Sequence, residues 1–194
     1  MKTILILLLW SFSSCTSNGQ RKVESFPNLA NFIDNDYSQV DNIFPIARVS
    51  INLEGNEYSI PISYSLLHYS VDSSNFLIKG DFIDNYSFNI LDDGKCRPLF
   101  KKEILKLPQD WAQFLTNTRQ RFDSAKLKIN LNNYLQFPSE PQWWQNDATP
   151  LSEDGSSMKF ICQIELRDIT TDDCCLFIFL DKKRNLVRQI YQRD

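Results

Sequence analysis

The chain has 194 residues, of which 42% are hydrophobic and 13% are aromatic, and it carries a formal net charge of -3. This length and this apolar fraction are sufficient for one domain with a sizeable core. Binding to nucleic acid needs a field of Lys and Arg that displaces counterions. The basic residues here are scattered, with Lys101-Lys102 and Lys182-Lys183-Arg184 as the tight groups, so we expect no nucleic-acid partner.

The start of the chain has the layout of an export signal. Lys2 supplies a positive charge, an unbroken apolar run follows from Ile4 to Trp10, and a serine-rich stretch ends at Cys15. The apolar run is too short to cross a bilayer, which takes about 20 apolar residues. We therefore expect residues 1–14 to direct export and then to be removed.

The segment Phe12-Ser13-Ser14-Cys15 resembles the lipobox of bacterial lipoproteins. In that family the cysteine thiol is lipidated and its amine becomes the new N-terminus, so the resemblance implies a chain anchored to a membrane by acyl chains, such as palmitate, on Cys15. The family usually has Leu three positions before the cysteine and Gly or Ala directly before it, where this chain has Phe12 and Ser14. Ordinary cleavage after Ser13, which would give an exported soluble protein, stays open as the alternative.

The rest of the chain is expected to be a tether followed by one domain. Residues 15–25 are assigned to a flexible tether, because the stretch from Thr16 to Glu24 is polar. Residues 26–194 contain no repeat of fixed period and no low-complexity run, which predicts a single folded domain.

Strand signals dominate from Ile46 to Ile90. Apolar and polar residues alternate on both sides of a turn at Glu54-Gly55-Asn56, which predicts a hairpin with one apolar face. Pro61 lies within the second strand of this hairpin and indicates an edge strand or a bulge. Two more strands, at Phe76–Phe82 and Tyr86–Leu91, are expected to continue an antiparallel meander.

A main helix is predicted over residues 108–123. Its apolar side chains recur at helical spacing after Pro108 and should pack on the sheet as a stripe. A shorter helix is expected near Asn28–Asp36, and the alternation from Leu127 to Leu131 predicts a strand directly after the main helix. The fold class is therefore α+β, mainly an antiparallel sheet with one packed helix. The stripe consists of Trp111, Phe114, Leu115, Thr118 and Phe122.

Two further strands are predicted in the last third of the chain. The first is Phe160–Leu166, with Phe160 and Cys162 on the same face, and the second is the apolar segment Leu176–Leu180, with both faces buried. The polar stretch Thr170–Asp173 supplies the turn between them.

The segment from Pro138 to Asp181 also carries a pattern of motifs. It contains a Pro-x-Trp segment with a Gln-x-Asp, a strand of the type Phe-x-x-Gln-Ile-x-Leu, and a later apolar strand with an acidic end. In these motifs it resembles the YwqG-like family, a group of bacterial proteins of unknown function. The family usually has a Gly before the last strand, where this chain has Cys174-Cys175. The resemblance implies a largely β, α+β domain and implies no reaction.

Few residues carry the chemistry of known catalytic or metal sites. His68 is the only histidine, and the chain has neither a Gly-x-Ser-x-Gly motif nor a Cys-x-x-Cys motif, so we expect no catalytic triad, no metal and no cofactor. The cysteines after Cys15 are interpreted as buried free thiols, although an exported chain could pair them in three ways. They are Cys96, Cys162, Cys174 and Cys175.

A candidate ligand-binding segment surrounds Trp143-Trp144. These indole rings lie next to Gln145 and Asp147, and aromatic faces beside polar groups suit a sugar or a peptide. The competing interpretation, which we favour, is that a tryptophan fills the core beneath a proline-braced loop. Gln163 has the same two interpretations, as a ligand-binding amide or as the partner of loop backbone groups, and again we favour the second.

Two functions follow as hypotheses. The first is a binding or interaction domain at the cell envelope, on the exported side of the inner membrane, with membrane lipid as a partner through Cys15 and a protein as a second partner. The second is a surface hydrolase that uses carboxylates near the Trp143-Trp144 loop. We favour the first, because no catalytic constellation is evident. The carboxylates are Glu140, Asp147, Glu153 and Asp154.

Overall fold

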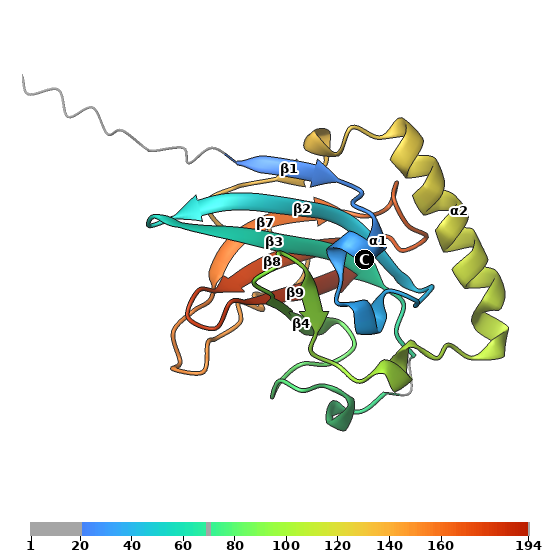
Figure 1. Cartoon of the computed structure of the whole chain (residues 1–194), viewed down its shortest axis with the longest axis horizontal. Helices are drawn as coiled ribbons and strands as arrows, with labels where there is room; N and C mark the ends of the chain where they lie inside the picture. The colour runs from blue at the N-terminus through green and yellow to red at the C-terminus, as the bar shows by residue number, and fades with distance from the viewer. Residues whose placement is uncertain (1–20, 69–70, 194) are drawn as a thin grey trace, which may run out of the picture.

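In the computed structural model, which describes residues 21–68 and 71–193, two antiparallel sheets pack together and one long helix flanks them (Figure 1). The predicted α+β class is confirmed. The expected export signal, the lipobox-like segment and Cys15 lie outside the described residues.

The smaller sheet contains three strands in the order β1 (Lys22–Ser25), β2 (Ile43–Leu53) and β3 (Asn56–Ser65). β2 and β3 form the predicted hairpin. Glu54 and Gly55 at its turn have φ values of 55° and 85°, the positive values at both central positions that a type I′ turn requires. The prediction that residues 15–25 form a flexible tether is wrong at its C-terminal end, because Lys22–Ser25 pairs with β2 and so belongs to the folded domain.

β3 lies at the edge of this sheet, which confirms the interpretation of Pro61. The backbone N–H of Ser63 donates to Gln189 Oε1 at 2.9 Å, and Gln189 Nε2 donates to the Ser63 carbonyl at 3.0 Å. Both backbone groups of Ser63 therefore face away from β2. Pro61, two residues earlier, has its nitrogen on the same open side, where its missing N–H removes no bond from the ladder.

The larger sheet contains six strands in the order β5-β4-β9-β8-β7-β6. Strands β7, β8 and β9 are consecutive antiparallel neighbours, and β9 at the C-terminal end lies between β8 and β4. The bounds are β4 (Asn85–Ile90), β5 (Cys96–Pro98), β6 (Leu135–Gln136), β7 (Lys159–Glu165), β8 (Cys174–Asp181) and β9 (Leu186–Arg193).

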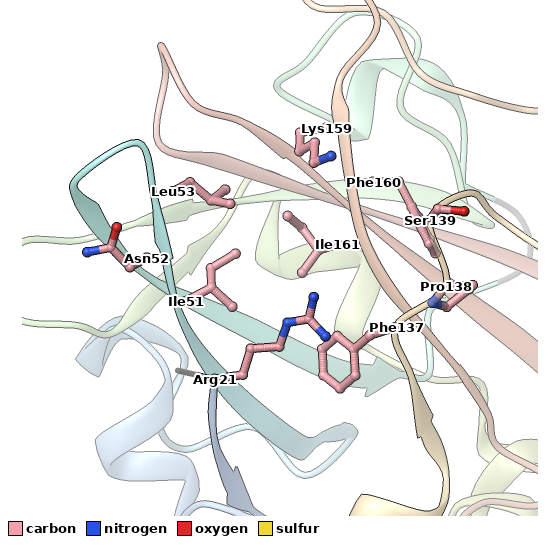
Figure 2. A pocket seen from close by; sticks show the side chains of 10 residues that line it. All are labelled: Arg21, Ile51, Asn52, Leu53, Phe137, Pro138, Ser139, Lys159, Phe160 and Ile161. Carbon is pink, nitrogen blue, oxygen red and sulfur yellow. The ribbon is translucent and has the colours of Figure 1, made fainter. Parts of the chain in front are cut away.

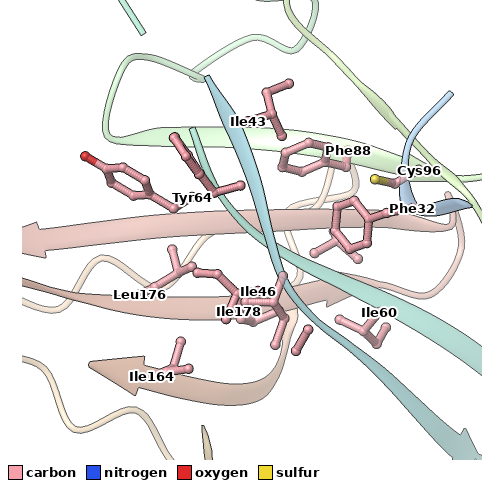
Figure 3. Packing of buried hydrophobic residues seen from close by; sticks show 14 of the residues in the cluster. Phe32, Ile43, Ile46, Ile60, Tyr64, Phe88, Cys96, Ile164, Leu176 and Ile178 are labelled. Carbon is pink, nitrogen blue, oxygen red and sulfur yellow. The ribbon is translucent and has the colours of Figure 1, made fainter. Parts of the chain in front are cut away.

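The main core lies between the two sheets. Ile46 and Ile60 from the smaller sheet and Ile164, Leu176 and Ile178 from the larger one are fully buried in a single cluster (Figure 3). Each such aliphatic side chain stabilises the fold by roughly 1.5–3 kcal/mol through removal from water.

A second cluster covers the other face of β8. Cys175, Phe177 and Phe179 alternate with the inward residues of this strand and are fully buried beneath loops. β8 is therefore apolar on both faces, as the sequence predicted. Leu99, Met158, Leu186 and Ile190 complete the cluster.

Both helices lie where the sequence predicted them, but their first and last residues differ from the prediction. α2 (Ala112–Lys128) follows a 3₁₀ turn and continues beyond residue 123, and Phe122 on its inner side packs against Phe26 and Phe44, with ring centroids 5.6 and 5.3 Å away. The shorter helix is α1 (Leu29–Phe32), and the backbone N–H of Ala30 donates to the side chain of its N-cap residue, Asn28.

Two predicted strands are wrong. The segment Phe76–Phe82 is a loop that turns at Gly80, where φ is 89°, and β4 after it joins the larger sheet instead of continuing a meander from β3. The segment Leu127–Leu131 is not a strand, because α2 continues to Lys128 and a 3₁₀ turn begins at Leu131. Leu127 on the helix is 87% exposed.

One predicted face is also wrong. A bulge between Phe160 and Cys162 shifts the register of β7 against β8. An extra residue in one strand reverses the alternation of side chains. Phe160 therefore packs against the second cluster, whereas Cys162 lies in the main core.

Candidate functional site

The Trp143-Trp144 loop covers the second hydrophobic cluster. The Trp143 ring lies 4.5 Å from that of Phe177 and 5.8 Å from that of Phe179, centroid to centroid. Trp144 is also half-buried and packs on the same cluster. Trp143 therefore fills part of the core beneath this loop, as the favoured interpretation held, and both tryptophans remain partly exposed.

Gln163 holds the start of this loop. Its side chain is only 3% exposed, its Oε1 accepts the backbone N–H of Gln142 at 2.8 Å, and its Nε2 donates to Gln136 Oε1 at 3.0 Å. The favoured interpretation of Gln163, that it satisfies loop backbone groups, is confirmed.

Gln192 on β9 holds the next part of the loop. Its Oε1 accepts the backbone N–H groups of Trp144 at 2.9 Å and Gln145 at 3.0 Å, and its Nε2 donates to the Asn146 carbonyl at 2.8 Å. Sequence reasoning missed this residue. The signal that could have found it is a glutamine inside an otherwise largely apolar terminal strand.

The other predicted residues of this segment also have local partners. Gln145 Nε2 donates to the Arg193 carbonyl, and Asp147 accepts the backbone N–H and the hydroxyl of Thr149 at 2.8 and 2.7 Å. These two bonds to Thr149 lower the pKa of Asp147. Trp143, Trp144 and Gln145 thus lie in one loop that Gln163 and Gln192 bind from the sheet, and Asp147 shapes a turn within this loop.

Two of the acidic residues near this loop lie beside cations. Asp154 accepts from Ser156 and pairs with Lys183 at 2.5 Å, contacts that lower its pKa, and Glu153 lies 3.5 Å from Arg184. Among residues 21–68 and 71–193, no group of three or more His, Cys, Asp or Glu is arranged to hold a metal ion.

The four cysteines that the structure describes are free and buried, as predicted. Burial raises the pKa of Cys174 and of Cys175 to about 12 and raises the pKa of Cys96 and Cys162 further. All four are therefore thiols at neutral pH, and none is an activated nucleophile.

Two carboxylates do meet at a pocket beside the start of α2, with a volume of about 290 Å³. The Tyr64 hydroxyl donates to Asp172 at 2.7 Å, and Arg193 pairs with both Asp172 and Asp84. The carboxylates converge on this guanidinium and not on open space, so the arrangement ties β3, the loop before β4, the loop before β8 and β9 together.

A different pocket, of about 360 Å³, lies where the ends of the two sheets meet (Figure 2). One wall is the end of β2 at Ile51–Leu53, the opposite wall is the start of β7 at Lys159–Ile161, and the segment Phe137–Ser139 closes the side. Arg21 reaches in along the Phe137 ring, with its guanidinium carbon 4.7 Å from the ring centroid.

This pocket combines two cations with an apolar floor. In the described part of the chain, neither Arg21 nor Lys159 forms an ion pair, whereas nearby Lys182 pairs with Glu54 at 2.6 Å. Ile51 and Ile161 lie between the two cations (Figure 2). The arrangement suits an anion with an apolar part. Sequence analysis did not bring these residues together.

Comparison with known proteins gives no match, either to a family model or to a curated protein or solved structure. None of the helices in residues 21–68 and 71–193 has the length and apolar character needed to cross a bilayer.

Proposed function

We propose that the chain is a bacterial lipoprotein whose domain binds a ligand or a protein at the cell envelope. In this proposal residues 1–14 direct export and lipid on Cys15 holds the mature chain on the exported side of the inner membrane. The support for the anchor is the apolar run Ile4–Trp10 and the lipobox-like segment Phe12–Cys15. The YwqG-like resemblance of Pro138–Asp181 adds no reaction to this proposal.

The observation that carries a binding role is the pocket of Figure 2. Its volume of about 360 Å³ falls within the range of small-ligand sites, and its cations Arg21 and Lys159 have no ion-pair partner among the described residues. A hydrolase receives less support, because Asp147, Glu153 and Asp154 have local partners and the Trp143-Trp144 loop is packed on the core; the fourth carboxylate, Glu140, is exposed.

Fractionation of bacteria that express the full chain tests the anchor. The wild-type protein is expected in the membrane fraction, resistant to high salt and released by detergent, because two or three acyl chains give nearly permanent attachment. The Cys15→Ser variant is expected to lose this behaviour. Equal partitioning of the two proteins would contradict the proposal.

A further inference from the structure

We propose that the pocket between the end of β2 and the start of β7 binds the phosphate headgroup of an anionic phospholipid in the membrane that carries the chain. This inference rests on the proposed function, since it takes the lipid on Cys15 as the reason why the domain stays at a bilayer.

The two cations of the pocket come from distant parts of the sequence and approach it from different strands. Arg21 precedes β1, and Lys159 is the first residue of β7 (Figure 2). A guanidinium presents a planar fork of donors that matches phosphate oxygens, and an ammonium adds a compact charge. The Phe137 ring under Arg21 holds the guanidinium plane by a cation–π contact. The two cations lie on opposite sides of Ile51 and Ile161, so the pocket offers positive charge to an anion from two sides (Figure 2).

Two acidic residues lie near the pocket, and one of them is paired with a cation outside it. Glu54, whose pKa is lowered first by Lys182 and further by the charge of Lys159, is bonded to Lys182. Glu57 lines the adjoining surface together with Arg21 and Lys22 and forms no ion pair among the described residues. The pocket itself is lined by two cations and by no carboxylate, so its net charge is positive.

The uncharged lining fits the rest of a lipid headgroup. Ser139 offers a hydroxyl to the glycerol hydroxyls, and Ile51, Phe160 and Ile161 form apolar walls for the first methylenes of the acyl chains. A protein partner is less well matched, because none of the exposed large hydrophobic residues of the described chain lines this pocket. Those residues are Leu77, Phe82, Leu127 and Leu151.

The short distance in sequence between Cys15 and Arg21 would keep the pocket near the bilayer. Arg21 follows Cys15 by six residues, and six extended residues span at most about 20 Å. A lipidated Cys15 would therefore keep Arg21 within this distance of the bilayer surface, and cations close to an anionic bilayer are attracted to it.

Vesicle binding of a chain without lipid tests the headgroup site. We would use the mature chain, residues 15–194, with Cys15→Ser, since both described core clusters lie between Val23 and Tyr191. This chain is expected to co-sediment with vesicles of phosphatidylcholine and phosphatidylglycerol, and not with phosphatidylcholine alone. In this background Arg21→Gln with Lys159→Gln is expected to weaken binding by more than about tenfold.

A matched control has the same charge change elsewhere. Arg121→Gln with Lys128→Gln removes two exposed cations of α2 that make no ion pair among the described residues, and it is expected to change binding by less than about threefold. Ser139→Trp, which fills the pocket and keeps both cations, is expected to weaken binding as the double variant does. If the two double variants lose binding equally, or if Ser139→Trp binds like the parent chain, the site is contradicted.

Competition by a soluble phosphate ester distinguishes a phospholipid headgroup from a free phosphate compound as the ligand. Excess glycerol phosphate is expected to compete with vesicles only weakly, because it lacks the acyl methylenes that the apolar walls would contact. Tight binding of glycerol phosphate without vesicle binding would overturn the assignment to lipid. Mass analysis of the wild-type chain tests the anchor independently: unmodified Cys15 together with pocket-dependent vesicle binding would refute the anchor and leave the headgroup site standing.

Discussion

Neutral amides on β7 and β9 of the larger sheet hold the Trp143-Trp144 loop and the open edge of β3. Gln163 and Gln192 bind backbone groups of the Trp143-Trp144 loop, and Gln189 binds both backbone groups of Ser63 at the open edge of β3. An amide carries one acceptor and two donors without a charge, so it can be buried at lower cost than a carboxylate or an ammonium.

Replacement of Gln192 by leucine is expected to destabilise the protein by roughly 2–4 kcal/mol, because two backbone N–H groups and one carbonyl lose their partner beneath the loop. Urea unfolding measures this change. Gln113→Leu on the exposed side of α2, where the side chain bonds only to Asn117, is the control and should cost less than about 0.5 kcal/mol. Equal unfolding midpoints for the two variants would contradict the role of Gln192.

Asp81 gives a pH dependence with a definite sign. Its carboxylate lies 2.9 Å from Arg188 in the interior, and burial raises its pKa to about 6 against the opposing effect of that guanidinium. In the unfolded chain the pKa is near the ordinary value of about 4. The folded state therefore binds the proton more readily, so this group stabilises the fold below about pH 4, and the contribution is lost as the pH rises through about 6.

The Asp81→Asn variant should accordingly lose more stability at about pH 4 than at about pH 7, because the amide cannot take up the proton. Urea unfolding of both proteins at the two pH values measures the difference. A loss that is the same at both pH values, or larger at the higher one, would show that Asp81 is ionised throughout this range.

At the scale of elements, the local sequence pattern predicted secondary structure correctly where one face of an element is apolar and the other is polar. The β2–β3 hairpin follows from a two-residue turn between alternating strands, and the position of Pro61 on an edge strand follows from its missing N–H. The prediction of a strand at Phe76–Phe82 was wrong because its apolar residues do not share one buried face. Phe76 is buried, whereas Leu77 and Phe82 are exposed.

β9 was not predicted, although it lies between β8 and β4 in the larger sheet. Arg188, Gln189 and Gln192 interrupt its apolar pattern, because each binds a partner from another segment.

The pocket of Figure 2 was missed for a related reason. Arg21, Phe137 and Lys159 are far apart in the sequence, and only the packing of the two sheets brings them together. The packing role of Trp143 could be predicted because it lies in a loop that contains prolines. The loop-binding role of Gln163 could be predicted because it is a polar residue within an apolar strand.

The attachment of α2 depends on few side chains. Thr118, Phe122 and Ala125 are buried, whereas most of the helix faces solvent. Phe122→Ala should therefore destabilise the protein by about 3–4 kcal/mol, because it empties the space between Phe26 and Phe44.

The matched control on the same helix is Leu127→Ala, whose side chain is 87% exposed and whose removal should cost less than about 0.5 kcal/mol. Urea unfolding followed by circular dichroism distinguishes the two variants. If Phe122→Ala were no more destabilising than the control, the helix would not be held by this contact.

At the scale of the whole molecule, two sheets share a core, and loops cover the second face of the larger sheet. The Trp143-Trp144 loop is part of that cover. The binding role that we propose belongs to a different site, the open pocket lined by two cations and by apolar side chains. This pocket is lined by Arg21, six residues after the cysteine that we propose to be lipidated.

Mass spectrometry of the mature N-terminus tests the proposed anchor most directly. The wild-type chain, purified from bacterial membranes in detergent, should begin at Cys15 and carry a diacylglyceryl group on its thiol. A mature protein that begins with an unmodified Ser14 would contradict the lipid anchor and would identify an exported soluble protein instead.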